Sequence, residues 1–317
     1  MICKYSDKCG GCLAPASFEE FHADCTVVRI PEGVRRRAKF KVDYGANVGF
    51  YARGTQNVVP IDSCAMLLPS INDLILPIRE LMRSMTVMSD GEVGVMAVEN
   101  GICIELKGMR IGPTDMARVR EFALAHDILR ISVDGRILLE RSPPVVRFGG
   151  RDVPYPVGAF LQPSVAGEEA IVNAVRSFMP AGAKSGVDLF SGLGLFSLSF
   201  PDIRWQAYDC DKDSIRVLKY MRVKAAVKDL SKHPVKKFDG VDVVVLDPPR
   251  QGALGQTKAV AEAGVPSVIY VSCNQKTFLR DRAHLDNCGY FLSGMAAIDQ
   301  FGDTGHMELV ANFTRKA

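Results

Sequence analysis

The sequence lacks the long apolar segments that are typical of membrane proteins. It contains no uncharged apolar run of about 18 residues, and its first residues, MICKYSDKCGGC, do not have the basic-then-apolar order of a secretion signal. We therefore expect a soluble, cytoplasmic monomer with no membrane partner. The sequence also lacks a large excess of charge of one sign, because its net charge is only +3. Composition alone therefore does not demand a nucleic-acid partner, and only a local cluster of positive charge would indicate one.

Nine cysteines are present without a secretion signal, so we do not expect a disulfide framework. Three of them, Cys3, Cys9 and Cys12, fall within ten residues, which is typical of a metal site. A tetrahedral zinc ion and a 4Fe-4S cluster both require a fourth ligand. Cys25 is nearer in sequence, but the segment SFEEFHADC that ends at it is predicted to be helical, and Cys64 is the other candidate.

The first half of the chain has the pattern of an antiparallel α+β layer. Residues 27–59 alternate apolar and polar side chains between turn signals, and residues 70–85 have helical spacing. The dipeptides Asn100-Gly101 and Asp134-Gly135 each stand between alternating runs and predict two hairpins. We expect a cysteine-rich loop over residues 1–25, this layer over 26–155 and a second domain over 156–317.

After Pro163 the pattern changes to apolar strands alternating with helices. The strands are GVDLF, WQAYD, DVVVLD and SVIYVS, and the helical stretches lie at 167–178, 212–226 and 275–285. This alternation predicts an α/β fold with a doubly wound, mainly parallel sheet. Ligands of such sheets bind beyond the carboxyl ends of the strands, so the residues that follow each strand are candidates for a site.

The first of these turns, DLFSGLGLF, has two glycines that permit a ligand to approach the backbone, Gly192 and Gly194. Ser197 stands where the dinucleotide fingerprint has its third glycine, which disfavours a pyrophosphate ligand. Asp209, after the next strand, is placed to accept hydrogen bonds from a ribose. The glycine turn and Asp209 together indicate a nucleoside ligand, for which S-adenosylmethionine is the commonest candidate. The alternative is a tight turn with a solvated carboxylate.

Two further strands end in reactive groups. In LDPPRQG, two prolines form a stiff turn flanked by Asp247 and Arg250, which suits a planar base. The strand SVIYVS ends at Cys273, which is either a small core residue or a nucleophile whose pKa is lowered by the helix that follows. Its position at the same edge as Asp209 and Asp247 favours the nucleophile.

Glu308 stands between apolar neighbours at the start of the last strand, in GHMELV. A carboxyl group there either faces water or is buried with a raised pKa and acts as a base. His306, two residues earlier, gives this site a second polar group.

Positive charge is concentrated in RRRAKFK, which has five cations in seven residues. Such a run is commonly a solvated surface. Because Arg35, Arg37, Lys39 and Lys41 alternate, one face of a strand is able to present all four to phosphates, and Arg250 is a further candidate.

The ordered series FLQPS, DLFSGLGLF, AYDCD, LDPPRQG, VSCNQKTFLRD and GHMELV resembles that of the S-adenosylmethionine-dependent RNA uracil-C5 methyltransferases. The N-terminal segments CKYSDKCGGC, RRRAKFKV and SCAMLLPSIN resemble the iron-sulfur branch of this family that acts on 23S rRNA. The small RNA-binding β-barrel common at the family's N-terminus has no counterpart before Cys3, which favours the shorter form. The likeness spans nearly the whole chain.

The resemblance implies a Rossmann-like class I methyltransferase domain behind the α+β domain. It makes Cys273 the nucleophile that adds to C6 of uracil, and Glu308 the base that removes the C5 proton. It also makes Cys64 the fourth ligand of a 4Fe-4S cluster, although zinc stays open. The cofactor contacts that it implies are Gln162, Phe190, Asp209, Asp229 and Asp247.

The sequence departs from the family pattern at Leu195, where asparagine is common, and at Gln275, where proline is usual. Two alternatives to a 23S rRNA methyltransferase therefore stand. One is a methyltransferase acting on the T-loop uridine of tRNA, and the other is a cluster-bearing RNA-binding protein without turnover.

Overall fold

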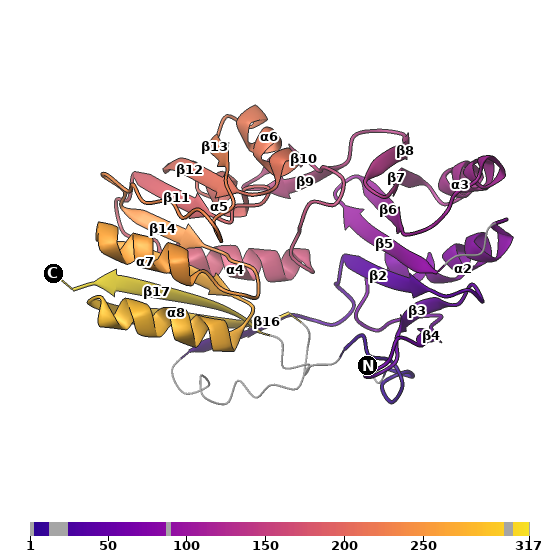
Figure 1. Ribbon diagram of the computed structural model, residues 1–317, viewed down its shortest axis with the longest axis horizontal. Coiled ribbons are helices and arrows are strands. Elements are labelled where there is room, and N and C mark those ends of the chain that lie inside the picture. Colours follow the sequence, from indigo (N-terminus) through magenta and orange to yellow (C-terminus); the bar gives the residue numbers. More distant parts are fainter. Residues whose placement is uncertain (1–2, 13–24, 87–89, 301–306, 317) are drawn as a thin grey trace.

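The computed structural model describes residues 3–12, 25–86, 90–300 and 307–316. These residues form two large sheets that lie side by side along the long axis of the molecule (Figure 1), with a small hairpin, β9 (Val145–Phe148) and β10 (Arg151–Pro154), in the chain between them. No helix in this part of the chain is long and apolar enough to cross a membrane.

The N-terminal sheet has seven strands. In spatial order these are β4 (Val58–Pro60), β3 (Val48–Tyr51), β2 (Arg37–Val42), β5 (Gly91–Val98), β6 (Gly101–Lys107), β7 (Ile128–Val133) and β8 (Arg136–Glu140). All neighbours are antiparallel except β6 and β7. Both predicted hairpins are confirmed, and Asp134 and Gly135 have the positive φ values, 44° and 80°, of a tight hairpin turn.

Helices cover one face of this sheet. They are α1 (Pro69–Asn72), α2 (Ile75–Ser84) and α3 (Pro113–Ala125), so the predicted helix over 70–85 is present as two pieces. Alternate residues of β2 face them: Ala38, Phe40 and Val42 are buried in the core with Ile75 and Val119. The intervening cations therefore point to the opposite face.

The C-terminal sheet has eight strands. In spatial order these are β1 (Thr26–Arg29), β16 (Tyr290–Asp299), β17 (Met307–Arg315), β15 (Ser267–Ser272), β14 (Val243–Leu246), β11 (Ser185–Leu189), β12 (Arg204–Asp209) and β13 (Lys224–Val227). Only β17 runs antiparallel to its neighbours. The predicted mainly parallel sheet is confirmed, and β11, β12, β14 and β15 end at one edge.

Helices cover both faces of this sheet, as in a doubly wound fold. The helices are α4 (Val165–Phe178), α5 (Leu195–Ser199), α6 (Lys212–Tyr220), α7 (Leu254–Ala263) and α8 (Gln275–Asn287). Apolar residues of α4 and α5 pack on one face with Val243, Val245 and Ile269. Those of α7 and α8 pack on the other with Val244, Leu246 and Val268. The alternation along β14 and β15 explains why these strands are apolar throughout.

Two sequence predictions about strands are wrong. The stretch 27–59 does not form one antiparallel layer, because β1 joins the C-terminal sheet and pairs in parallel with β16. The helix predicted over 212–226 ends at Tyr220, Arg222 takes a positive φ of 65°, and residues 224–227 form the edge strand β13. The domain boundaries themselves stay a prediction.

Candidate active site

A cavity of about 930 Å³ opens at the edge where the parallel strands end. Eleven of the predicted site residues line it: Cys12, Arg35, Arg37, Gln162, Phe190, Asp209, Asp229, Asp247, Arg250, Cys273 and Glu308. They come from both halves of the chain, so the cavity lies where the cationic end of β2 meets the C-terminal sheet.

The turn after β11 shapes one wall of the cavity. Phe190 has a positive φ of 62°, a strained conformation for a bulky residue, and Gly192 has a φ of 49°. The backbone N–H of Gly192 donates to Asp209 Oδ2 at 2.9 Å, and the N–H of Asp211 donates to Asp209 Oδ1 at 2.8 Å. Asp209 therefore ties the turn after β11 to the turn after β12, and each oxygen keeps a second lone pair for a ligand.

Two more carboxyl groups lie beneath this wall. Asp188 is buried and accepts hydrogen bonds from the backbone and hydroxyl of Ser197. Burial raises its pKa to about 6, while burial together with the charges of Asp188 and Asp209 raises the pKa of Asp247 to about 7. A cationic ligand would relieve the repulsion among these carboxylates.

The remaining two predicted cofactor residues, Gln162 and Asp229, also line the cavity. Gln162 is buried, and its Oε1 accepts a hydrogen bond from Gln300 at 3.2 Å. Asp229 is half-buried, pairs with Lys232 at 3.2 Å and accepts from the backbone N–H of Ser231. These contacts hold the pKa of Asp229 below its usual value, mainly through Lys232.

Cys273 and Glu308 come together from adjacent strands. In the antiparallel ladder of β15 and β17, Ser272 pairs with Leu309. Cys273 directly follows Ser272 and Glu308 directly precedes Leu309, so the two residues adjoin the end of this ladder, and both line the cavity. A thiol and a carboxyl group therefore face one volume.

The thiol is not acidic, which overturns the predicted effect of the helix that follows. Burial raises the pKa of Cys273 to about 11, and the charges of Glu308 and Asp247 contribute to this rise, against a smaller opposite effect of Arg250. Desolvation, followed by the charges of two carboxyl groups, is the main cause of the rise, and the helix α8 begins at Gln275, after its cap Asn274.

Glu308 has the raised pKa that its apolar neighbours predict. It is buried, and desolvation with the charge of Asp247 raises its pKa to about 8, while Arg37 and Arg250 act in the opposite direction. A carboxyl group with such a pKa is suited to exchange a proton near neutral pH. His306 lies outside the described residues.

Comparison with known proteins agrees with this chemistry. The family model described as tRNA (uracil-5-)-methyltransferase matches residues 216–316. An uncharacterized RNA methyltransferase of Mesorhizobium japonicum is 30% identical over 98% of this chain and 83% of its own length. The chain belongs to the RNA uracil-C5 methyltransferase family.

Two further relatives are similar over most of their length. A 23S rRNA (uracil(1939)-C(5))-methyltransferase of Chromohalobacter salexigens is 29% identical over 99% of this chain and 76% of that protein. The structure of a Pyrococcus abyssi tRNA (uracil-54, C5)-methyltransferase, solved with S-adenosyl-L-homocysteine, covers 92% of this chain and 79% of its own with a TM-score of 0.73. At 22% identity that likeness shows the shared fold.

The cationic run of this RNA methyltransferase family member divides into two groups. Arg35 and Arg37 line the cavity; Arg37 donates to the carbonyl of Leu161 at 2.7 Å and lies 4.7 Å from the ring of Phe160. Lys39 and Lys41 share Glu92, at 3.9 and 2.6 Å. Arg37, Lys39 and Lys41 do share one face of β2, but only the arginine end reaches the cavity.

The four cysteines of the predicted cluster, Cys3, Cys9, Cys12 and Cys64, line a second cavity of about 760 Å³. Cys12, Arg35 and Arg37 also line the first cavity. Four thiols are the donor set that zinc or a 4Fe-4S cluster requires. Within the described ranges, no three His, Cys, Asp or Glu side chains are arranged to hold a metal ion. Cys25 lines a different groove, beside α4 and β16.

Sequence reasoning missed the middle arginine of RRRAKFK. Arg36 is 3% exposed, forms an ion pair with the buried Glu168 of α4, and donates from Nε to the carbonyl of Gln162 at 3.0 Å. Alternation was the available signal: Arg36 has the parity of Ala38 and Phe40, the buried face of β2.

The two departures from the family pattern lie beside the cavity. Leu195 begins α5 and packs against the apolar clusters next to the sheet. Gln275 is the first residue of α8, and Asn274 caps the helix by accepting from the N–H of Thr277. A helix begins at each of these two positions, and neither side chain lines the cavity.

Proposed function

We propose that this protein transfers a methyl group from S-adenosylmethionine to C5 of a uridine in 23S rRNA. The observation that carries the proposal is the pair of Cys273 and Glu308, which line one cavity together with Gln162, Phe190, Asp209, Asp229 and Asp247. The 29% identity to the 23S rRNA enzyme over 99% of this chain supports the choice of RNA.

The cofactor end of the cavity has the chemistry that this ligand needs. Asp209 offers oxygens to a ribose, while Phe190 offers an aromatic surface to the ligand. When bound, S-adenosylmethionine supplies an electrophilic methyl group and a sulfonium charge. A positive charge beside Asp247, which lines the cavity, would offset the repulsion by Asp188 and Asp209 that helps to raise its pKa.

Cys273 and Glu308 have separate roles in the proposed reaction on uracil. The Cys273 thiolate adds to C6, and the C5–C6 π electrons shift to give an enolate whose C5 is nucleophilic. After C5 carries the methyl group, ionised Glu308 removes the C5 proton, and those electrons restore the double bond and expel the thiolate. Arg37 and Arg250 line this cavity and favour the charged form of Glu308, and Arg250 also favours that of Cys273.

Cys3, Cys9, Cys12 and Cys64 would hold a 4Fe-4S cluster beside this site, joining the N-terminal loop to the seven-stranded sheet. The donor chemistry and the shared cavity support this assignment. No step of the uracil chemistry requires it.

Trapping tests the proposal. A 23S rRNA fragment containing 5-fluorouridine should form an adduct with the protein in the presence of S-adenosylmethionine, because fluorine at C5 blocks the final elimination. Cys273→Ala should form none, and Cys288→Ala, at an exposed position, should react as the wild type does. No adduct with any ribosomal or transfer RNA would favour an RNA-binding protein without turnover.

The tRNA (uracil-5-)-methyltransferase family and the Pyrococcus abyssi tRNA enzyme, which this chain resembles, make tRNA the second candidate. Mapping 5-methyluridine in RNA from a strain that lacks the protein separates the two. A missing 5-methyluridine in 23S rRNA supports the proposal, and one missing from the T-loop of tRNA overturns it.

A further inference from the structure

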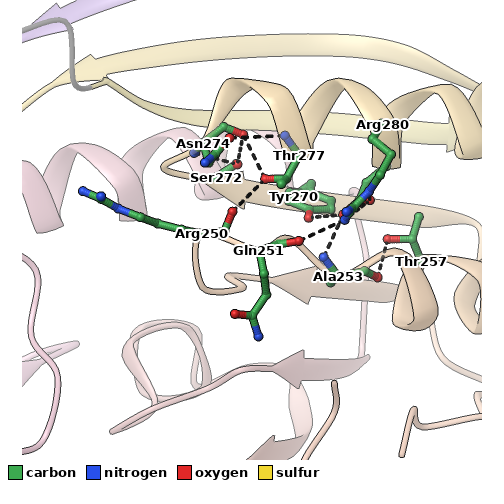
Figure 2. A network of polar contacts seen from close by, with 10 residues as sticks. Arg250, Gln251, Ala253, Thr257, Tyr270, Ser272, Asn274, Thr277 and Arg280 are labelled. Atoms are coloured by element: carbon green, nitrogen blue, oxygen red, sulfur yellow. Dashed lines mark hydrogen bonds and ion pairs between the residues drawn. The ribbon is translucent and has the colours of Figure 1, made fainter. Parts of the chain in front are cut away.

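The loop that follows β14 has two sides with different contacts. The side chains of Asp247, Pro248, Pro249, Arg250 and Gln251 line the catalytic cavity. The backbone of residues 250–253 instead faces helix α8, which lies behind the loop. In Figure 2 the side chain of Arg250 points away from this helix.

Helix α8 binds this backbone through three side chains. Thr277 Oγ1 donates to the carbonyl of Arg250 at 3.1 Å, and Arg280 Nη2 donates to the carbonyl of Gln251 at 3.0 Å. Asp281 Oδ2 accepts from the N–H of Ala253 at 2.7 Å. Three residues of the loop, Arg250, Gln251 and Ala253, are therefore held to α8 through their backbone groups rather than through their side chains (Figure 2).

Asp281 is the centre of this network. It is fully buried, pairs with Arg280 at 2.7 Å, and accepts from the hydroxyl of Tyr270 at 2.7 Å. Tyr270 lies in β15, three residues before Cys273, so one carboxylate ties the strand of the nucleophile to the loop of Arg250. Charge-assisted hydrogen bonds of this kind fix geometry more strongly than neutral ones.

The loop also approaches α8 too closely for any side chain at its turn. Gly252 has a φ of 71°, and a Cβ atom there would lie 2.7 Å from Arg280 Nη2 and 2.8 Å from Asp281 Oδ2. This close approach and the hydrogen bonds together fix the position of the loop relative to the helix.

We infer that Asp281 is a positioning residue: with Arg280 and Thr277 it fixes the loop backbone and thereby holds the Arg250 guanidinium beside the Cys273 thiol. The charged groups that face this thiol are Glu308 from β17, and Asp247 and Arg250 from the loop. Arg250 is the cation among them, so its placement governs how readily the thiolate forms. The inference rests on the proposed function only in taking Cys273 as the nucleophile.

Alkylation of Cys273 by iodoacetamide, followed against pH in the intact protein, tests this without RNA. The tryptic peptide of residues 259–276 contains Cys273 as its only cysteine, so mass spectrometry resolves its rate from the other eight thiols. Below the thiol pKa, Arg250→Ala should slow alkylation about tenfold, which corresponds to about one pKa unit. Asp281→Asn should also slow the alkylation of Cys273.

A double-mutant cycle identifies the route. If Asp281 acts through Arg250, the Arg250→Ala/Asp281→Asn protein should be no slower than Arg250→Ala alone. An unchanged pH profile in Asp281→Asn, or effects that multiply in full, would overturn the inference. Should Asp281→Asn fail to fold, Thr277→Val removes only one hydroxyl and must show a smaller shift of the same sign.

Arg282→Lys is the matched control, because Arg282 lies on the same helix and pairs with Asp286 rather than with the loop. Its profile should equal that of the wild type. A variant with a lower Tm and an unchanged alkylation profile shows a structural role alone and counts against the inference. A shifted profile in a protein that methylates no RNA supports the inference and contradicts the proposed function.

Discussion

Cys273 and Glu308 line one cavity: Cys273 directly follows Ser272, Glu308 directly precedes Leu309, and Ser272 and Leu309 are paired in the β15–β17 ladder. A thiol and a carboxyl group thus line the same cavity, and the charge of Glu308 contributes to the raised pKa of Cys273. In the proposed reaction the two groups would act at neighbouring uracil carbons, C6 and C5, and their place in one cavity is consistent with that chemistry.

Glu308→Gln should stall the reaction after the methyl group has reached C5. Without the base, the C5 proton stays and the thiolate is not expelled, so a covalent protein–RNA adduct should accumulate with ordinary uridine. Denaturing gels with labelled RNA measure it. Glu308→Gln/Cys273→Ala is the control and should give no adduct; rapid turnover by Glu308→Gln would assign the base elsewhere.

The activity should rise with pH. Both the thiol, with a pKa of about 11, and Glu308, with a pKa of about 8, must lose a proton to act. We therefore expect kcat/KM to increase from about pH 6 to beyond about pH 8 rather than to fall on the alkaline side of neutrality. Glu169→Gln, at an exposed glutamate on α4, should keep this profile, and a maximum below about pH 7 would contradict the assigned groups.

Glu308→Gln should also change the thiol in a predictable direction. Removal of a negative charge beside Cys273 lowers its pKa, so alkylation below that pKa should be faster than in the wild type although methylation is lost. The same variant thus separates thiol ionisation from proton removal.

Much of the site was predictable because parallel strands end at one edge. Asp209, Asp247 and Cys273 each follow a strand, and that topology alone predicts that they meet. The confirmed hairpins at Asn100-Gly101 and Asp134-Gly135 depend on local turn chemistry, which sequence also carries.

The features that could not be predicted from the sequence depend on contacts between segments that are far apart in the chain. β1 resembles the strands that follow it, and only its pairing with β16, about 270 residues later, places it in the other sheet. The pKa of Cys273 was predicted in the wrong direction, because the helix is adjacent in sequence whereas Glu308 and Asp247 approach only in the fold.

The ion pair of Arg36 and Glu168 should be essential for stability. Burial raises the pKa of Glu168 to about 7 even beside Arg36, so Arg36→Met leaves a carboxyl group without its compensating charge. Removing one partner of a buried pair costs about 3–5 kcal/mol in the free energy of unfolding. Urea titration measures it.

The cost of Arg36→Met should also depend on pH. A carboxyl group whose pKa is higher in the folded than in the unfolded protein loses stabilising effect as pH rises from its ordinary 4.5 towards the raised value. The free energy of unfolding of Arg36→Met should therefore fall furthest below that of the wild type above about pH 7. Asp152→Asn, which breaks the exposed pair with Arg147, should change the free energy of unfolding by less than about 1 kcal/mol at any pH.

Cys64→Ser should abolish the proposed cluster. Protein purified without oxygen is expected to absorb near about 400 nm, as 4Fe-4S proteins do, and the variant should lose this band together with its bound iron. Cys288→Ser, at an exposed cysteine outside the cavity, should keep both. Stoichiometric zinc in place of iron would overturn the iron-sulfur assignment and leave the ligand set intact.

Asp209 should matter to the cofactor in two separable ways. Its oxygens hold Gly192 and Asp211 at 2.9 and 2.8 Å, and the same oxygens are proposed to accept from a ribose. Asp209→Ala removes both effects, whereas Asp209→Asn keeps one carbonyl acceptor and replaces the other with a donor. Calorimetry with S-adenosyl-L-homocysteine should therefore give a larger Kd for alanine than for asparagine, by about tenfold for one lost hydrogen bond. Asp213→Ala, at an exposed carboxylate on α6 that pairs with Arg216, should bind as the wild type does. Equal binding by all three variants would remove Asp209 from the cofactor site and leave it as a link between the two turns.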